Sequence, residues 1–104
     1  LIRAHPNLFL ITSHCNPMVS TSGKQPWTRL FKKQDFKPEW KELIMAHPDR
    51  FVLAFDNVFS FHWAGDFYSQ VVYWRKMLKK LPEKTAAAIA YQNAQRLWKI
   101  QMDR

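Results

Sequence analysis

The chain has 104 residues, of which 47% are hydrophobic, including five Trp and eight Phe. This composition excludes a disordered or low-complexity chain, and the length limits the sequence to one domain at most. Lysine and arginine outnumber aspartate and glutamate by 16 to 8, but they are interleaved with apolar positions at helical spacing. That spacing favours solvated helix faces over a nucleic-acid groove.

The cysteine content and the hydropathy exclude other classes of protein. The single cysteine, Cys15, cannot form an intrachain disulfide, and no zinc-finger spacing of Cys and His surrounds it. No apolar run approaches the length of a membrane span, and no signal peptide opens the sequence. We therefore expect a cytoplasmic protein that binds neither nucleic acid nor a membrane.

Two segments of the sequence repeat one another. LIRAHPNLFLIT at residues 1–12 matches LIMAHPDRFVLAF at residues 43–55 with a constant offset of 42. Each copy predicts the tail of a helix, closed by a proline, followed by a continuous apolar strand. The strands are predicted at about residues 7–13 and 50–55. His5 and His47 would lie at helix C-termini, where we assign them a structural role only.

The segment between the two strands predicts a crossover connection. A loop rich in Ser, Thr, Gly and Pro covers residues 16–26, and a basic stretch follows it. Pro38 is typical of the first turn of a helix, which continues through Trp40 and Ile44. Because strands that are apolar on both faces are typical of parallel sheets, the sequence predicts a βαβ unit.

Two more helices are predicted after the second strand. Asp66 follows the loop NVFSFHWAG as an expected N-cap for a helix over about residues 66–80, and Pro82 opens a last helix over about 82–101. One face of the last helix carries Ala86, Ile89, Ala90, Asn93, Ala94 and Leu97. Since two parallel strands do not form an independently stable domain, we expect the chain to belong to a larger α/β fold.

The motifs PDRFVLAFD and IAYQNAQRLW, in this order, resemble the C-terminal part of the amidohydrolase superfamily, in its amidohydrolase-related branch. That branch contains metal-dependent TIM-barrel hydrolases and decarboxylases. The resemblance covers nearly all of residues 1–104, taken as a single segment. It implies that the chain is the C-terminal portion of a (β/α)8 barrel, with the predicted strands as the last two of eight in a fold of ~250 residues.

The same resemblance implies a role for Asp56. In the family, the carboxylate that closes the last strand binds a divalent metal, here expected to be zinc, and takes the proton from the metal-bound water. The implied reaction is hydrolysis of an amide, ester or lactone, or decarboxylation of a small carboxylic acid. The alternative is that Asp56 caps a turn or the next helix. The family's His-x-His pair and its other histidine ligands have no counterpart in this sequence.

Three further residues are candidates for contact with a substrate. With the offset of 42, His14 ends its strand where Asp56 ends the next, so His14 would face the same pocket. The alternative is a satisfied histidine at a strand end. His62 and Trp63 lie on the following loop, where they would form either a substrate wall or aromatic packing. Cys15 is interpreted as an inert buried thiol and not as a nucleophile.

A second function remains open from the sequence. The chain could be a truncated, non-catalytic relative that acts as a basic, aromatic-rich binding or assembly module. In either case, unpaired strand edges and uncovered aromatic side chains predict homo-oligomers or the exchange of elements between copies.

Overall fold

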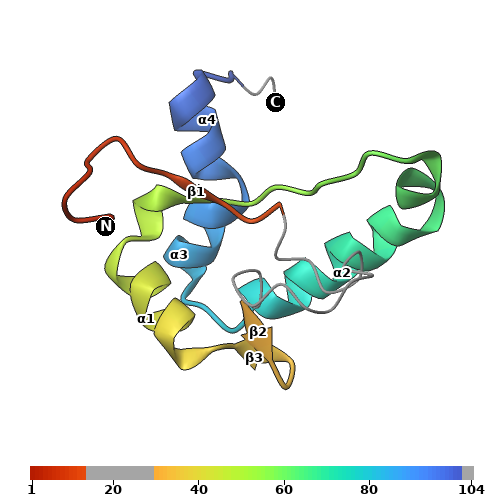
Figure 1. Cartoon of the computed structure of the whole chain (residues 1–104), viewed down its shortest axis with the longest axis horizontal. Coiled ribbons are helices and arrows are strands. Elements are labelled where there is room, and N and C mark those ends of the chain that lie inside the picture. Colours follow the sequence, from red (N-terminus) through yellow and green to blue (C-terminus); the bar gives the residue numbers. More distant parts are fainter. Residues whose placement is uncertain (14–29, 102–104) are drawn as a thin grey trace.

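The computed structural model describes residues 1–13 and 30–101. Figure 1 shows the order and arrangement of the elements. The strands are β1 (Leu10–Ile11), β2 (Phe31–Lys32), β3 (Asp35–Phe36) and β4 (Phe51–Val52). The helices are α1 (Pro38–Ala46), α2 (Phe67–Leu78), α3 (Glu83–Ala87) and α4 (Asn93–Trp98). The shorter turns are a 3-10 turn, η2 (Pro48–Arg50), and two π-helical turns, η3 (His62–Asp66) and η4 (Ala88–Gln92).

Strands β1 and β4 are adjacent and parallel, which confirms the predicted pairing of the two repeated segments. The strands are shorter than predicted, with Leu10 beside Phe51 and Ile11 beside Val52. The side chain of Thr12 extends the pair, because its Oγ1 donates to the Ala54 carbonyl over 3.1 Å and accepts from the Ala54 N–H over 3.0 Å. A buried hydroxyl group therefore replaces a backbone partner at the end of the ladder.

The expectation of a (β/α)8 barrel is wrong. A barrel strand pairs with a strand on each edge, but the second edge of β4 is bonded to the C-terminal helices. The N–H of Leu53 donates to the Ile89 carbonyl over 3.0 Å, and the Phe51 carbonyl accepts from Asn93 Nδ2 over 2.7 Å. Within residues 1–13 and 30–101 the sheets are the parallel β1–β4 pair and a separate antiparallel hairpin. The chain thus has a small α/β fold.

The hairpin of β2 and β3 occupies the basic stretch that precedes α1. Its two turn residues, Lys33 and Gln34, both have positive φ, of 51° and 59°, as in the turns that join twisted antiparallel strands closely. Phe31 packs against Phe36 with ring centroids 5.0 Å apart, and its ring lies 5.1 Å from the ring of Trp74 on α2. These aromatic contacts fix the hairpin to the core.

Helix α1 begins as predicted, with Pro38 in its first turn. Its C-cap is His47, whose N–H donates to the Leu43 carbonyl over 3.0 Å, and Pro48 then opens η2. Arg50 connects the two copies of the repeat, because its Nε donates to the Leu8 carbonyl over 2.7 Å and its guanidinium lies 5.0 Å from the ring centroid of Phe9.

Helix α2 differs from the prediction at its start. Asp66 makes no side-chain capping hydrogen bond, because the helical backbone begins upstream in the π-helical turn η3. The buried face of α2 consists of Gln70, Trp74 and Met77, spaced four and three residues apart. A polar side chain, Gln70, therefore belongs to the buried face of the helix, together with Trp74 and Met77.

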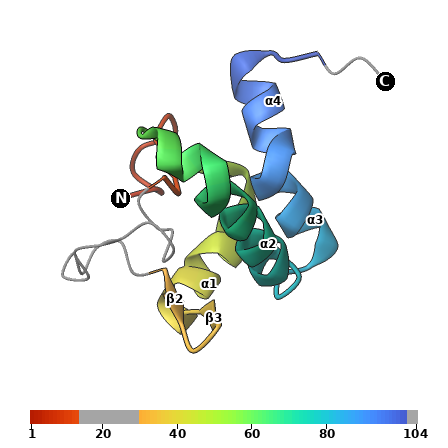
Figure 2. The same cartoon turned by 90° about the vertical axis from the view of Figure 1, so that its right-hand side faces the viewer.

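Helix α3, turn η4 and helix α4 follow one another along one rod, as Figure 1 shows. Ile89 and Asn93 on this rod are buried, in agreement with the predicted face of the last helix. Figure 2, turned by 90°, shows α2 in front of α1 and α3. The core where these helices meet contains Ile44, Phe51, Trp74, Met77, Leu81 and Ile89.

No helix within the described ranges is long and apolar enough to cross a membrane.

Candidate functional site at the end of strand β4

The carboxylate of Asp56 lies on the segment that leaves β4. This segment runs outward from the core before the chain turns back into α2 (Figure 1). The parallel ladder ends at Ala54, which bonds to the Thr12 side chain. Asp56 comes two residues later, and the Asp56 side chain is exposed. The sequence thus carries a charged group directly beyond the carboxyl end of the paired strands.

The next residue, Asn57, connects this segment to α2. Gln70 Nε2 donates to Asn57 Oδ1 over 3.0 Å, and Gln70 is completely buried. The hydrogen bond fixes the position of the backbone beside Asp56 relative to the face of α2 that packs on the core. An exposed carboxylate therefore lies next to a buried polar anchor.

His62 organises the loop that follows. It is buried, with 7% of its surface exposed, and its Nδ1 accepts hydrogen bonds from the N–H groups of Val58 (3.0 Å) and Phe59 (3.1 Å). Because Nδ1 accepts, the proton of the neutral ring is on Nε2. The Phe61 ring packs edge-on against the imidazole at 4.4 Å. His62 thus shapes the loop, and its contact with a substrate stays a prediction.

Trp63 is exposed, in contrast to His62, and belongs to a row of aromatic rings. Its ring centroid lies 5.5 Å from that of Phe67, which in turn lies 5.9 Å from that of Phe55. Phe55 directly precedes Asp56, so this row of contacts connects Trp63 to the carboxylate's own segment. Phe59 and Phe61 add a stacked pair on the same loop, 5.6 Å apart and inclined by 10°.

His14 and Cys15 lie outside the residues that the structure describes. The predicted proximity of His14 to Asp56 is therefore not tested. Asp56, His62 and Trp63 all belong to the segment that connects β4 to α2.

The described residues do not by themselves fit a metal ion. In residues 1–13 and 30–101, no group of three or more His, Cys, Asp or Glu side chains is close enough to hold one. A catalytic zinc site needs three protein ligands. Asp56 can supply one carboxylate oxygen donor, and the other ligands of a metal site would have to come from outside the described residues.

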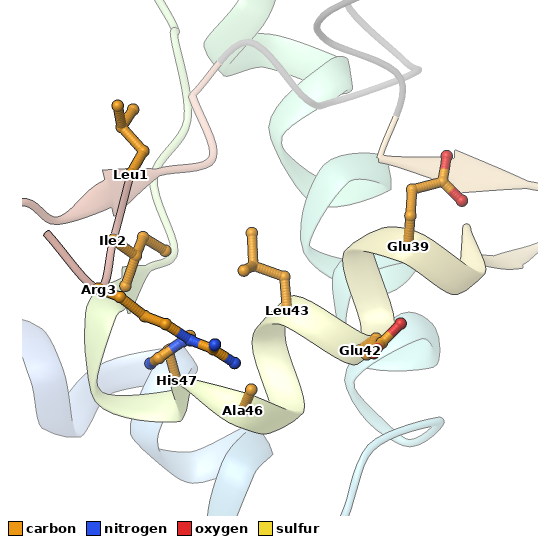
Figure 3. A pocket seen from close by; sticks show the side chains of 8 residues that line it. All are labelled: Leu1, Ile2, Arg3, Glu39, Glu42, Leu43, Ala46 and His47. Atoms are coloured by element: carbon orange, nitrogen blue, oxygen red, sulfur yellow. The ribbon is translucent and has the colours of Figure 1, made fainter.

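A hollow of about 340 Å³ lies elsewhere, between the N-terminal segment and α1 (Figure 3). It is lined by apolar side chains and by charged or titratable ones at its margin, namely Leu1, Ile2, Leu43, Ala46, Arg3, Glu39, Glu42 and His47. Of the predicted site residues that the structure describes, neither Asp56 nor His62 nor Trp63 lines it. We assign the hollow no chemistry.

Sequence interpretation missed Gln70 and Asn57. Gln70 has the spacing of the buried positions, four residues before Trp74 and seven before Met77. A glutamine at such a position was a usable signal of a buried polar contact, because a polar group that is buried needs a partner.

Comparison with protein-family models, with curated proteins and with solved structures found no match. The resemblance to the amidohydrolase-related family therefore stays a prediction that depends on the two sequence motifs.

Proposed function

We propose that this chain contributes to a metal-dependent hydrolase of the amidohydrolase-related kind, with Asp56 as its catalytic carboxylate. The substrate would be the amide, ester or lactone of a small carboxylic acid, or the acid itself in a decarboxylation. The position of Asp56 carries the proposal: it is exposed and lies just beyond the carboxyl end of a parallel strand. Ligands of α/β proteins bind at that end of their sheets.

A carboxylate suits this role chemically. An ionised Asp can accept the proton of an attacking water molecule, and it can also bind a cation. The remaining metal ligands are expected outside the described residues, with His14 and Trp63 as substrate contacts. The proposal concerns the chemistry of the strand end and does not require the barrel.

The two motifs of the family resemblance are also in contact, which supports considering them together. Asn93, from IAYQNAQRLW, donates through Nδ2 to the carbonyls of Pro48 and Phe51, both in PDRFVLAFD, over 2.7 Å each. Arg96, from the same motif, donates to the Asp49 carbonyl over 2.8 Å. Each motif thus positions the other at the start of β4.

We place the activity in the cytoplasm, because the chain's one cysteine leaves no intrachain disulfide.

Turnover that depends on a metal tests the proposal. The purified chain is stripped with a chelator and assayed against amides, esters, lactones and unsaturated carboxylic acids, before and after addition of Zn²⁺. Activity that appears with Zn²⁺ and disappears with chelator is the expected result. Absence of turnover with Zn²⁺, Mn²⁺ and Co²⁺, in a chain shown to be folded by circular dichroism, would contradict it.

A second candidate function is the binding or assembly module. Exposed aromatic side chains favour it: Phe59, Phe61 and Trp63 each keep 59% of their surface exposed. Sedimentation over a range of concentrations separates the candidates. If the chain is a binding or assembly module, it should self-associate, and Phe59→Ser should weaken the association without changing turnover. If the loop belongs to an enzyme site, Phe59→Ser should change KM. Tyr91→Ser, at an exposed aromatic of η4, is the matched control.

A further inference from the structure

Three side-chain polar atoms are buried and have no hydrogen-bond partner within the described part of the chain. They are Asn57 Nδ2, Gln70 Oε1 and Trp74 Nε1. Gln70 is 0% exposed and Trp74 is 2% exposed. A buried polar group without a partner destabilises a fold, so native proteins rarely leave three of them together.

The three atoms belong to one cluster. Gln70 and Trp74 are four residues apart, one helical turn, on the buried face of α2. Asn57 is bonded directly to Gln70 through its Oδ1, at 3.0 Å. The cluster therefore presents two N–H donors, from Asn57 and Trp74, and one carbonyl acceptor, from Gln70.

We propose that this cluster binds a single water molecule. The water accepts hydrogen bonds from Asn57 Nδ2 and Trp74 Nε1 through its two lone pairs and donates one proton to Gln70 Oε1. Three bonds are the usual number for a buried water. An anion would be repelled by the carbonyl oxygen and a cation by the two N–H groups, and the complete burial of Gln70 leaves no access for a larger ligand.

The water site has a consequence for Asp56, which rests on the proposed function. Asn57 is connected to α2 twice, directly through Oδ1 and through the water at Nδ2. This double connection fixes the peptide that joins Asp56 to Asn57. Gln70 is thereby a positioning residue for the Asp56 carboxylate, and it acts without touching the substrate.

The water is tested by nuclear magnetic resonance on the folded chain, without any measurement of turnover. The expected result is a cross-peak between water and the indole N–H of Trp74. The indole signal is assigned to Trp74 by its disappearance in Trp74→Phe. Gln70→Leu should abolish the cross-peak while the indole signal remains, because the water loses its acceptor. Gln92→Leu, at an exposed glutamine of η4, should leave it unchanged.

Two results would overturn the water site. One is a folded parent chain with no cross-peak between water and the Trp74 indole. The other is a crystal structure in which Asn57 Nδ2 bonds directly to Gln70 Oε1 with no water density between Gln70 and Trp74. If Gln70→Leu does not fold, the parent and the Trp74→Phe spectra still decide the outcome.

The positioning role is tested separately by kinetics. Gln70→Leu should lower kcat about tenfold, the scale of a lost partner behind a catalytic group, with KM within twofold of the parent. Gln92→Leu should change neither. Unchanged kcat in folded Gln70→Leu would refute the positioning role. Absence of turnover in the parent would instead refute the proposed function. The water site would still be tested by the magnetic resonance spectra.

Discussion

Asn93 is the residue on which the junction between the last helix and β4 depends. It is 1% exposed, and its Nδ2 donates to two carbonyls, of Pro48 and Phe51. Its Oδ1 accepts from Arg96 Nη1 over 3.1 Å. Both amide functions are therefore used, and the side chain serves as a substitute for a neighbouring strand at the edge of β4.

Replacing Asn93 by Ala should lower the free energy of unfolding by about 2–3 kcal/mol, because the buried Phe51 carbonyl and the part-buried Pro48 carbonyl lose their donor. Gln92→Ala, next to it on an exposed position, is the control and should change stability by less than about 0.5 kcal/mol. Urea unfolding followed by circular dichroism measures both. Equal stability of Asn93→Ala and Gln92→Ala would show that the junction does not depend on these bonds.

Tyr73 makes the stability of the fold depend on pH in the alkaline range. Burial raises the pKa of its hydroxyl above the ordinary value of 10.0, and its ring packs edge-on against Phe31 at 5.3 Å. The folded state thus favours the neutral phenol. Its stabilising contribution is complete below pH 10 and is lost as the pH rises through the raised pKa of the folded state.

Tyr73→Phe should therefore reduce the loss of stability above about pH 10, because Phe has no proton to lose. The matched control is Tyr68→Phe, at a tyrosine that is 75% exposed, which should follow the parent's pH profile. Parallel curves for parent and Tyr73→Phe would refute the effect of burial.

At the scale of elements, the hairpin β2–β3 contains two non-glycine residues in the left-handed region. Lys33 has φ of 51°, and a side chain in this region raises the energy of the backbone by about 1 kcal/mol. Lys33→Gly should therefore stabilise the fold by about 0.5 kcal/mol after the greater entropy of glycine in the unfolded chain is subtracted.

Lys32→Gly is the control for that change. Lys32 lies in β2, next to the turn, so glycine has the same cost in the unfolded chain without relief of a left-handed conformation. We expect Lys32→Gly to lower the melting temperature and Lys33→Gly to raise it. A lower melting temperature for both variants would show that the turn carries no strain at Lys33.

Most of the helices and the parallel pair could be predicted from the sequence, whereas the hairpin could not. Pro38 and the repeated apolar runs are strong local signals, and the structure agrees with them. The hairpin lacks the Asn-Gly or Asp-Gly dipeptide that marks such turns, and aromatic contacts from Phe31 to α2 stabilise it instead. The upstream start of α2 was missed because η3 contains glycine and no capping side chain.

At the scale of the whole molecule, a strand's partners depend on contacts between distant residues. The apolar runs of the two repeats predict burial on both faces, and this is correct for Phe51 and Val52. The apolar runs do not specify which residues bond to the second edge of β4. Here Leu53 bonds to Ile89 and Phe51 bonds to Asn93, so helices cover the edge where a barrel needs a strand.

The candidate site was predicted in part, for the same reason. The ending of a strand in Asp56 is a local signal, and the structure shows this carboxylate exposed after β4. The anchoring of its neighbour Asn57 by Gln70 is a contact between residues 13 positions apart, which no local pattern specifies. The burial of His62 was likewise hidden, because its partners are backbone N–H groups.

The most direct measurement of the central claim is the metal-dependent turnover of Asp56→Asn compared with Asp66→Asn. Asn keeps the shape of the side chain but removes its charge and most of its basicity, so Asp56→Asn should lose ~10²-fold or more in kcat, the scale of a lost general base. Asp66→Asn, on the same connecting segment, should stay within a factor of a few of the parent. Turnover of Asp56→Asn within a factor of a few of the parent, with metal still bound, would contradict the assignment of Asp56 as the catalytic carboxylate.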